Sequence, residues 1–199
     1  LSEQSLERLA GMGEHEKLEY ELFARYARTL ALLETSNLDA ALEAAGEQER
    51  VAQQVGEYGN IADLARPQQQ LAVAKASVTS RFARAENSPA RGIPDLESTI
   101  ESVTLSPHEL AWPMHELATA YLEAGQPETA AATAQRILDA IPTSPDLNLL
   151  AAKAHARAGD RDTALNHLQV YLDVMRNADE GHSRVAEATN LLQQLTPRS

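Results

Sequence analysis

Hydrophobic residues recur at helical spacing along the first part of the chain. Between residues 16 and 33 they stand three or four positions apart, a period that places them on one face of a helix. We therefore expect a helix over 16–33. Polar residues 34–37 interrupt the pattern, and Ser36 or Asn37 is the expected cap of a second helix that ends near Val55. The members of the stripe are Leu18, Leu22, Tyr26, Leu30 and Leu33.

The next segments contain residues that interrupt helices. The sequence GEYGN at 56–60 predicts a break, and a third helix is expected from 61 to about 85. Pro67 lies inside that third helix. It must kink or restart the helix, because proline lacks the N–H donor and clashes with the preceding turn. Residues 86–97, polar with two prolines and a glycine, predict a loop or hinge between two halves.

In the second half, one pattern of residues occurs twice. Residues 121–139 align with residues 155–173 at an offset of 34, and each copy places a glycine between two helical stretches. Both copies share an Ala-Gly turn, a Thr-Ala pair and a Leu-Asp pair in one register, which argues against a chance match. The identical pairs are Ala124/Ala158, Gly125/Gly159, Thr129/Thr163, Ala130/Ala164, Gln135/Gln169, Leu138/Leu172 and Asp139/Asp173.

A 34-residue unit of helix, glycine turn and helix is the tetratricopeptide period, and the chain resembles that family over residues 111–178. If Ala111 opens the first unit, five residues occupy the positions of the family's leucine, small residues, tyrosine and closing proline. These residues are Leu117, Ala118, Tyr121, Ala130 and Pro142.

The second unit opens at Pro145 and departs from the family pattern. It keeps small residues at Ala152 and Ala164, but His155 stands where tyrosine is usual and Arg176 where proline is usual. In the first unit, Ala134 occupies a position where an aromatic residue is common, so we expect thinner packing there.

Capping signals support these boundaries. Ser106 to Glu109 reads as a capping box with proline in the first helical position, and Ser144 precedes Pro145 in the same way. The amphipathic stretch 183–195 would cover the open end of the second unit. We therefore predict an all-α fold, an antiparallel helix-hairpin array (a TPR-like α-solenoid) with a degenerate helical N-terminal half. Its parts are a helical region over 1–85, a loop or linker with a possible short helix over 86–105, and repeats with a capping helix over 106–199.

Composition agrees with this fold and narrows the function. The 199 residues are 43% hydrophobic but only 4% aromatic, and the formal net charge is −12. An acidic surface with three lysines repels nucleic acid and anionic membranes. No apolar run approaches the roughly 20 residues of a membrane span. Without cysteine, thiolate catalysis, disulfides and Cys-ligated zinc are excluded.

The tetrapeptide His-Glu-Leu-Ala occurs twice, beginning at His108 and His115. Seven helical residues rise by roughly 10 Å, so the two rings cannot share one zinc ion at bonds of about 2 Å. We interpret the doubling as a short capped turn followed by a helix that begins near Ala111, with Pro113 in its first turn. No catalytic residue, metal or cofactor is predicted.

The resemblance implies that the first helices of successive units line a concave groove. The candidate partner-binding residues are Trp112, His115, Thr119 and Glu123 from the first unit, and Leu149, Lys153 and Arg157 from the second. Trp112 is either a peptide anchor or a plug between the first unit and the preceding helix. Lys153 and Arg157 either grip a carboxylate of the partner or pair with Asp146 or Asp160.

The leading hypothesis is a non-enzymatic scaffold that binds a protein or peptide in this groove. One alternative is a sensory or coupling domain of a larger regulatory protein, and another is a module that forms homo-oligomers. The chain begins with leucine, which suggests trimming. The compartment stays open between the cytoplasm and, after removal of a leader, the periplasm of a bacterium.

Overall fold

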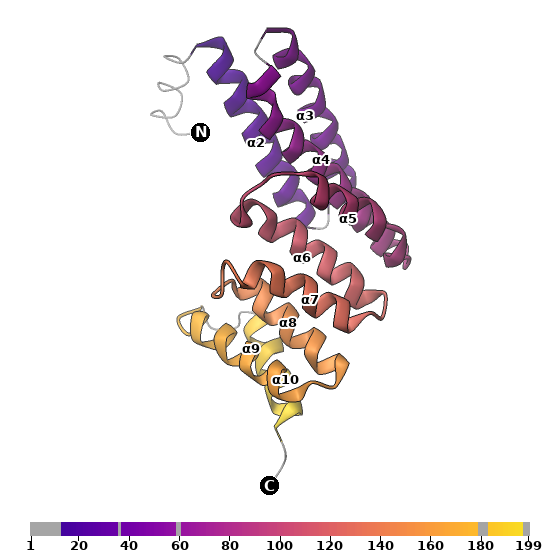
Figure 1. Ribbon diagram of the computed structural model, residues 1–199, viewed down its shortest axis with the longest axis vertical. Coiled ribbons are helices and arrows are strands. Elements are labelled where there is room, and N and C mark those ends of the chain that lie inside the picture. Colours follow the sequence, from indigo (N-terminus) through magenta and orange to yellow (C-terminus); the bar gives the residue numbers. More distant parts are fainter. Residues whose placement is uncertain (1–12, 36, 59–60, 179–182, 197–199) are drawn as a thin grey trace.

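The computed structural model describes residues 13–35, 37–58, 61–178 and 183–196, where every regular element is a helix. The helices follow one another along the long axis of the molecule (Figure 1). This arrangement confirms the predicted all-α hairpin array. The elements are α2 (Glu14–Glu34), α3 (Leu38–Tyr58), α4 (Ile61–Ala85), the 3-10 helix η1 (Pro89–Arg91), α5 (Ile93–Ser102), α6 (Pro107–Glu123), α7 (Pro127–Leu138), α8 (Pro145–Ala158), α9 (Arg161–Val174) and α10 (Ser183–Leu195).

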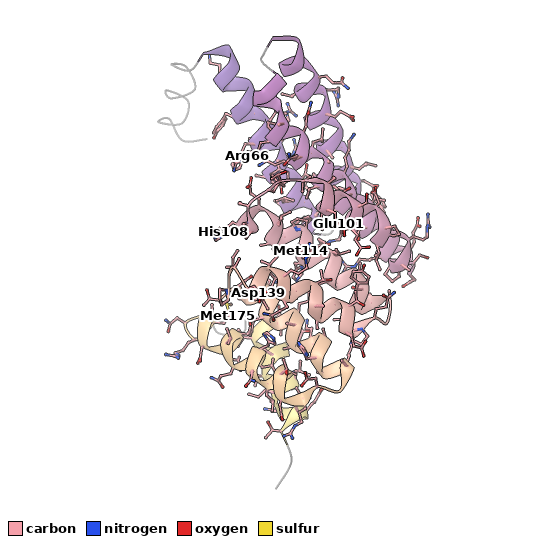
Figure 2. All side chains as sticks on the ribbon, viewed as in Figure 1. Arg66, Glu101, His108, Met114, Asp139 and Met175 are labelled. Carbon is pink, nitrogen blue, oxygen red and sulfur yellow. The ribbon has the colours of Figure 1, made fainter. Side chains whose placement is uncertain are left out.

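Small side chains let the helices of the repeats approach closely. The hairpins α6–α7 and α8–α9 pack against each other, and their shared core consists mainly of alanine and leucine with one methionine. The side chains of Ala118, Ala130 and Ala134 are fully buried. At Ala134, where we expected thinner packing, the helices approach closely enough to leave the side chain no exposed surface. Met114 fills the centre of this core, whereas His108 on the same helix lies at the edge of the molecule (Figure 2).

Both repeat glycines adopt the conformation that the alignment predicts. Gly125 has φ 77° and Gly159 has φ 84°, the left-handed region that ends a helix and reverses the chain. After each glycine the next N–H returns to the helix, from Gln126 to the Tyr121 carbonyl and from Asp160 to the His155 carbonyl, both at 2.9 Å. The two turns are therefore equivalent copies.

The last helix covers the second hairpin, as its amphipathic pattern predicts. Ala188 on α10 is fully buried beside Leu168 and Tyr171 of α9 and Leu149 of α8. Leu191 and Leu192 pack on the same cluster while remaining partly exposed.

The N-terminal helices largely follow the hydrophobic pattern. Leu22, Tyr26 and Leu33 of the stripe are buried and Leu30 is half-buried; the Leu18 side chain lies outside the described residues. Asn37 caps α3, accepting a 3.4 Å hydrogen bond from the Ala40 N–H, and Ser36 lies outside the described part.

Two expected interruptions in this half do not occur as predicted. Residues 56–58 continue α3, so this part of the expected break is wrong; residues 59–60 lie outside the description. Helix α4 runs through Pro67 without restarting. A proline removes one N–H donor, but α4 packs against α2, α3, α5 and α6, and that packing maintains the helix.

The possible short helix of the linker predicted over 86–105 is present as α5, whereas the loop predicted over 86–97 is wrong from residue 93 onward. Helix α5 begins there, and its buried Ile93, Leu96 and Ile100 join the repeat core. A Cβ at Gly92 would lie 2.5 Å from the Ser80 Cα, so glycine allows this corner to touch α4. The segment packs against α4 and α6 and is not a hinge. The prediction missed the helix because its three apolar residues at helical spacing stand among polar ones.

The start of α6 also differs from the prediction. The capping box is present: Ser106 Oγ accepts from the Glu109 N–H at 3.4 Å, and Glu109 accepts from the Ser106 N–H at 3.0 Å. However, α6 begins at Pro107 and continues through the buried Pro113, so the separate capped turn before Ala111 is wrong.

At the second unit the side-chain cap expected from Ser144 is absent. Ser144 is the N-cap residue of α8 but makes no side-chain capping hydrogen bond. Asn148 Nδ2 instead donates to the Pro142 and Ser144 carbonyls at 2.8 and 2.9 Å, and so holds the α7–α8 loop.

The glycine turns allow a matched stability test. We expect Gly159→Ala to lower the free energy of unfolding by about 1–2 kcal/mol, because alanine is strained at positive φ although no atom obstructs its Cβ. Gly46→Ala, inside α3 and equally unobstructed, should raise it by roughly 0.5–1 kcal/mol. Urea denaturation measures both. Equal stability of Gly159→Ala and the parent chain would contradict the repeat turn.

Candidate functional site

One side of the array is formed by the helices α4, α6, α8 and α10. Helix α6 contacts α4 and α8, and α8 contacts α10. Three adjacent hollows lie along these helices. We call the side chains that line them, together with Arg84 beside them, the inner wall.

The structure brings six of the seven predicted residues into one hollow. His115, Thr119 and Glu123 of α6 and Leu149, Lys153 and Arg157 of α8 line a space of about 240 Å³ between the two helices. Trp112 lines the neighbouring hollow of about 260 Å³, which His115 also borders.

Equivalent positions of successive units form rows across the inner wall. Residues 34 positions apart occupy corresponding places on α6, α8 and α10, and all of them line the hollows. The repeat therefore converts three positions of one helix into three rows. The rows are His115/Leu149/Ser183, Thr119/Lys153/Glu187 and Glu123/Arg157/Leu191.

The two apolar candidates offer little free surface. Leu149 is only 3% exposed, because α10 covers it. Trp112 is half-buried and packs on a cluster of α2, α3 and α4 that includes Leu33, Val78 and Phe82. That contact is the one expected of a plug at the junction, and the rest of the ring borders the hollow.

Ion pairs connect successive helices of the wall. Lys153 Nζ lies 2.6 Å from Glu187 Oε1 of α10, and Arg184 of α10 pairs with Asp146 of α8. Arg157 donates to the Leu122 carbonyl at 3.2 Å. The predicted pairing of Lys153 or Arg157 with Asp146 is therefore wrong, because α10 supplies the partners of Lys153 and Asp146, and α6 supplies that of Arg157.

The same holds for the other predicted partner. Asp160 faces His155, with 3.3 Å between the Asp160 Oδ2 and His155 Nδ1 atoms, and caps α9 through the Thr163 N–H. Neither alternative carboxylate thus reaches the two cations of α8.

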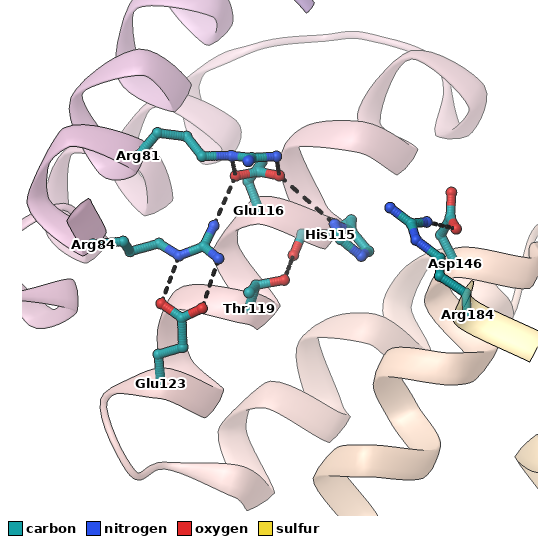
Figure 3. Close-up of polar contacts among 8 residues, drawn as sticks. All are labelled: Arg81, Arg84, His115, Glu116, Thr119, Glu123, Asp146 and Arg184. Carbon is teal, nitrogen blue, oxygen red and sulfur yellow. Dashed lines mark hydrogen bonds and ion pairs between the residues drawn. The ribbon is translucent and has the colours of Figure 1, made fainter. Parts of the chain in front are cut away.

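Sequence reasoning missed the most buried charge of the wall, Glu116. Its side chain is fully buried and accepts two hydrogen bonds from Arg81, at 2.5 Å from Nε and 2.6 Å from Nη2 (Figure 3). Arg84 adds a third at 3.0 Å and also holds Glu123 through two bonds of 2.7 Å. The available signal was a glutamate on the apolar face of α6, between Met114 and Leu117.

His115 and Arg81 together determine the charge of this carboxylate. Burial alone would raise the pKa of Glu116, but the neighbouring His115 ring and the Arg81 guanidinium outweigh it and lower the pKa. Glu116 is therefore ionised, and its charge lies between two guanidinium groups of α4.

A second link between α4 and α6 lies about two helical turns closer to the cap. Glu109 accepts from Arg66 at 2.9 Å and from Gln70 at 3.3 Å. The Ser106 hydrogen bonds, followed by the Arg66 contact, lower the pKa of Glu109 to about 2, although burial opposes this shift.

Comparison with known proteins agrees with the geometry. A family model described as tetratricopeptide repeat matches residues 121–187. The solved TPR domain of P58(IPK) superposes with a TM-score of 0.52 at 12% identity, over 92% of this chain and 52% of that one. The protein is TPR-like. This chain spans about half the length of the P58(IPK) chain, and at that identity the likeness shows the fold alone. No curated protein matches the chain in sequence.

Side-chain packing accommodates one departure of the second unit from the family pattern. His155, in the family's tyrosine position, stacks on His167 with ring centroids 5.5 Å apart and an interplanar angle of 15°. His167 Nδ1 lies 2.9 Å from Asn148 Oδ1. Two histidines thus replace one aromatic ring in joining α8 to α9.

The histidines and carboxylates do not form a metal-binding arrangement in the described part of the chain. No three side chains among histidine, aspartate and glutamate converge there as possible ligands. Among the described helices, none combines the length and hydrophobicity that a membrane span requires. TPR-like folds generally serve as protein-interaction scaffolds, which directs attention to the inner wall.

The buried Glu116 predicts a large effect of a small change. Glu116→Gln should lower the free energy of unfolding by roughly 3–5 kcal/mol, because it leaves the Arg81 charge without its buried counter-charge. Glu123→Gln should lower the free energy of unfolding by less than about 1 kcal/mol, because the Glu123 side chain is 42% exposed where it pairs with Arg84. Chemical denaturation of both variants tests this, and equal losses would argue against a special role for Glu116.

The histidine pair predicts acid sensitivity. Burial, then the nearby His155, lowers the pKa of His167, so folding favours its neutral form. This contribution to stability is present above pH 6.5 and is lost as the pH falls through the lowered value. Melting temperatures of His167→Gln between pH 7 and about pH 5 should fall less than those of the parent chain. The exposed His108→Gln should follow the parent; a His167→Gln profile identical to the parent would count against this role.

Proposed function

We propose that the inner wall binds an extended segment of a partner protein and that the protein is a non-enzymatic scaffold. The observation that carries this proposal is the set of three rows that equivalent positions of α6, α8 and α10 form along connected hollows. An extended segment meets regularly spaced side chains on such a surface, and TPR-like folds generally bind proteins.

The binding would rely on polar groups more than on large apolar anchors. Leu149 is covered by α10 and Trp112 is half-buried, so Leu191 and the free edge of Trp112 supply the apolar contacts. His115 and Thr119 supply hydrogen-bonding groups at the edge of the hollow. Lys153, Arg157 and Glu123 would set the orientation of the bound segment through their charges.

The state of the charged groups supports a binding role over a catalytic one. Three carboxylates of the wall, those of Glu116, Asp146 and Glu187, each pair with an arginine or lysine of another helix. A general acid or base needs a pKa near neutrality, whereas the contacts of Glu116 lower the pKa of its carboxyl. We assign no catalytic residue, metal or cofactor, and the net charge of −12 disfavours nucleic acid as the partner.

Self-association is a second candidate function, favoured by exposed aromatic residues at the other end of the molecule. On α2, Phe23 is 58% and Tyr20 is 41% exposed, and adjacent exposed apolar side chains can mark an interaction surface. A sensory or coupling role within a larger protein is an alternative use of the same inner wall.

Site-specific photo-crosslinking tests the location of the binding surface. A benzoylphenylalanine at Thr119, on the inner wall, should yield an adduct with a partner in a lysate of the source organism. The same residue at Ala132, exposed on α7 and outside the hollows, should yield none. Mass spectrometry identifies the adducts.

Three outcomes separate the candidates. Loss of the Thr119 adduct in both the Trp112→Ala and Lys153→Glu backgrounds supports the wall. An adduct at Ala132 alone would move the site to the outer face. An adduct of twice the chain mass would identify a second copy of the chain as the partner at the crosslinked position.

A further inference from the structure

The charges of the inner wall are balanced, unlike those of the whole chain. The chain carries a formal net charge of −12, whereas among the described residues of the wall the cationic side chains outnumber the anionic ones by one. The cations are Arg81, Arg84, Lys153, Arg157 and Arg184, and the anions are Glu116, Glu123, Asp146 and Glu187. An acidic ligand is therefore repelled less strongly at the inner wall than at other parts of the surface.

Within the described wall, Arg157 is the cation without a carboxylate partner. Its guanidinium is exposed and donates to the Leu122 carbonyl. The row explains why: its neighbour on α6 is Glu123, which two 2.7 Å bonds bind to Arg84, and its neighbour on α10 is the apolar Leu191. The carbonyl satisfies one of the five N–H donors of the guanidinium.

Lys153 lies one turn away on the same face of α8, and its partner is replaceable. The pair with Glu187 is partly exposed, with 29% of the Lys153 side chain and 50% of the Glu187 side chain accessible. Exposed pairs of this kind contribute about 0–1 kcal/mol, so a carboxylate from a ligand can displace Glu187 at small cost.

We propose that the inner wall recognises an extended acidic segment of the partner protein, with one carboxylate on Arg157 and a second displacing Glu187 from Lys153. This rests on the proposed function. Residues four apart on a helix rise by about 6 Å, and alternate residues of an extended chain are about 7 Å apart on one face. The two cations therefore match acidic side chains at alternate positions, while the residues between them point away from the wall.

The geometry assigns opposite roles to Arg157 and Glu187. Arg157 attracts the ligand, whereas Glu187 competes with it for Lys153. Removing the first charge must weaken binding of an acidic segment, and removing the second must strengthen it. A variant that merely unfolds the protein would lower affinity and cannot produce the second effect.

Fluorescence anisotropy with defined peptides measures this. The probes are fluorescein-labelled peptides of alternating glutamate and leucine, and of alternating glutamine and leucine, titrated with the full chain. We expect the glutamate peptide to bind about tenfold tighter, and its advantage to shrink in high salt. Arg157→Gln should remove that advantage, and Glu187→Gln should tighten binding of the glutamate peptide about threefold. Arg136→Gln, an exposed arginine of α7 outside the hollows, should change neither.

Every other result overturns the inference. Equal binding of the two peptides, no binding of either with a Kd below about 1 mM, or an unchanged preference in Arg157→Gln excludes an acidic segment at this position. Such a result leaves the proposed function standing if the Thr119 crosslink forms. Loss of the Thr119 crosslink removes the wall itself as the binding surface.

Discussion

The buried carboxylate of Glu116 holds the two halves of this molecule together. It lies on α6, the first helix of the repeats, and both arginines that bind it come from α4, the last long helix of the N-terminal half. Because an unpaired buried charge is so costly, α4 and α6 are restricted to the orientation in which these bonds form. The Glu109–Arg66 contact fixes the same two helices near the start of α6. The N-terminal half thereby becomes a continuation of the array.

From that junction onward, small residues and left-handed glycines repeat one geometry. Ala118, Ala130 and Ala152 allow close helix contact, and Gly125 and Gly159 reverse the chain in the same way. Each unit therefore adds its first helix beside that of the previous unit. Equivalent side chains fall into rows as a direct result, and α10 completes the rows while covering the apolar end of the array.

The inner wall owes its character to how these rows are paired. Neighbouring helices neutralise most of its charges, which keeps a largely polar surface ordered without exposing a large apolar patch. Arg157 departs from this pattern, since its row offers an occupied glutamate on one side and a leucine on the other. The features available to a partner are therefore charges and hydrogen-bonding groups, with modest apolar contacts. A binding surface of this kind depends on ionic strength, as exposed charges are screened by salt.

Features encoded over short distances could be read from the sequence alone. The 34-residue offset, both glycine turns, the Ser106 capping box, the stripe of α2 and the bounds of α10 depend on local spacing, and the structure has each of them. The candidate residues on α6 and α8 followed from the resemblance to the tetratricopeptide family, whose first helices line one side of the array.

The tertiary structure decided the features that depend on contacts between distant segments. The pairing of Glu116 with Arg81, the pairing of Lys153 with Glu187, and the packing of Trp112 on the N-terminal helices each join residues at least 30 positions apart. Packing also maintains α5, and the continuity of α4 through Pro67, against residues that disfavour helices. A linear pattern specifies which face of a helix is apolar; the neighbour that covers it, and the charge that faces it, are set only when the helices pack.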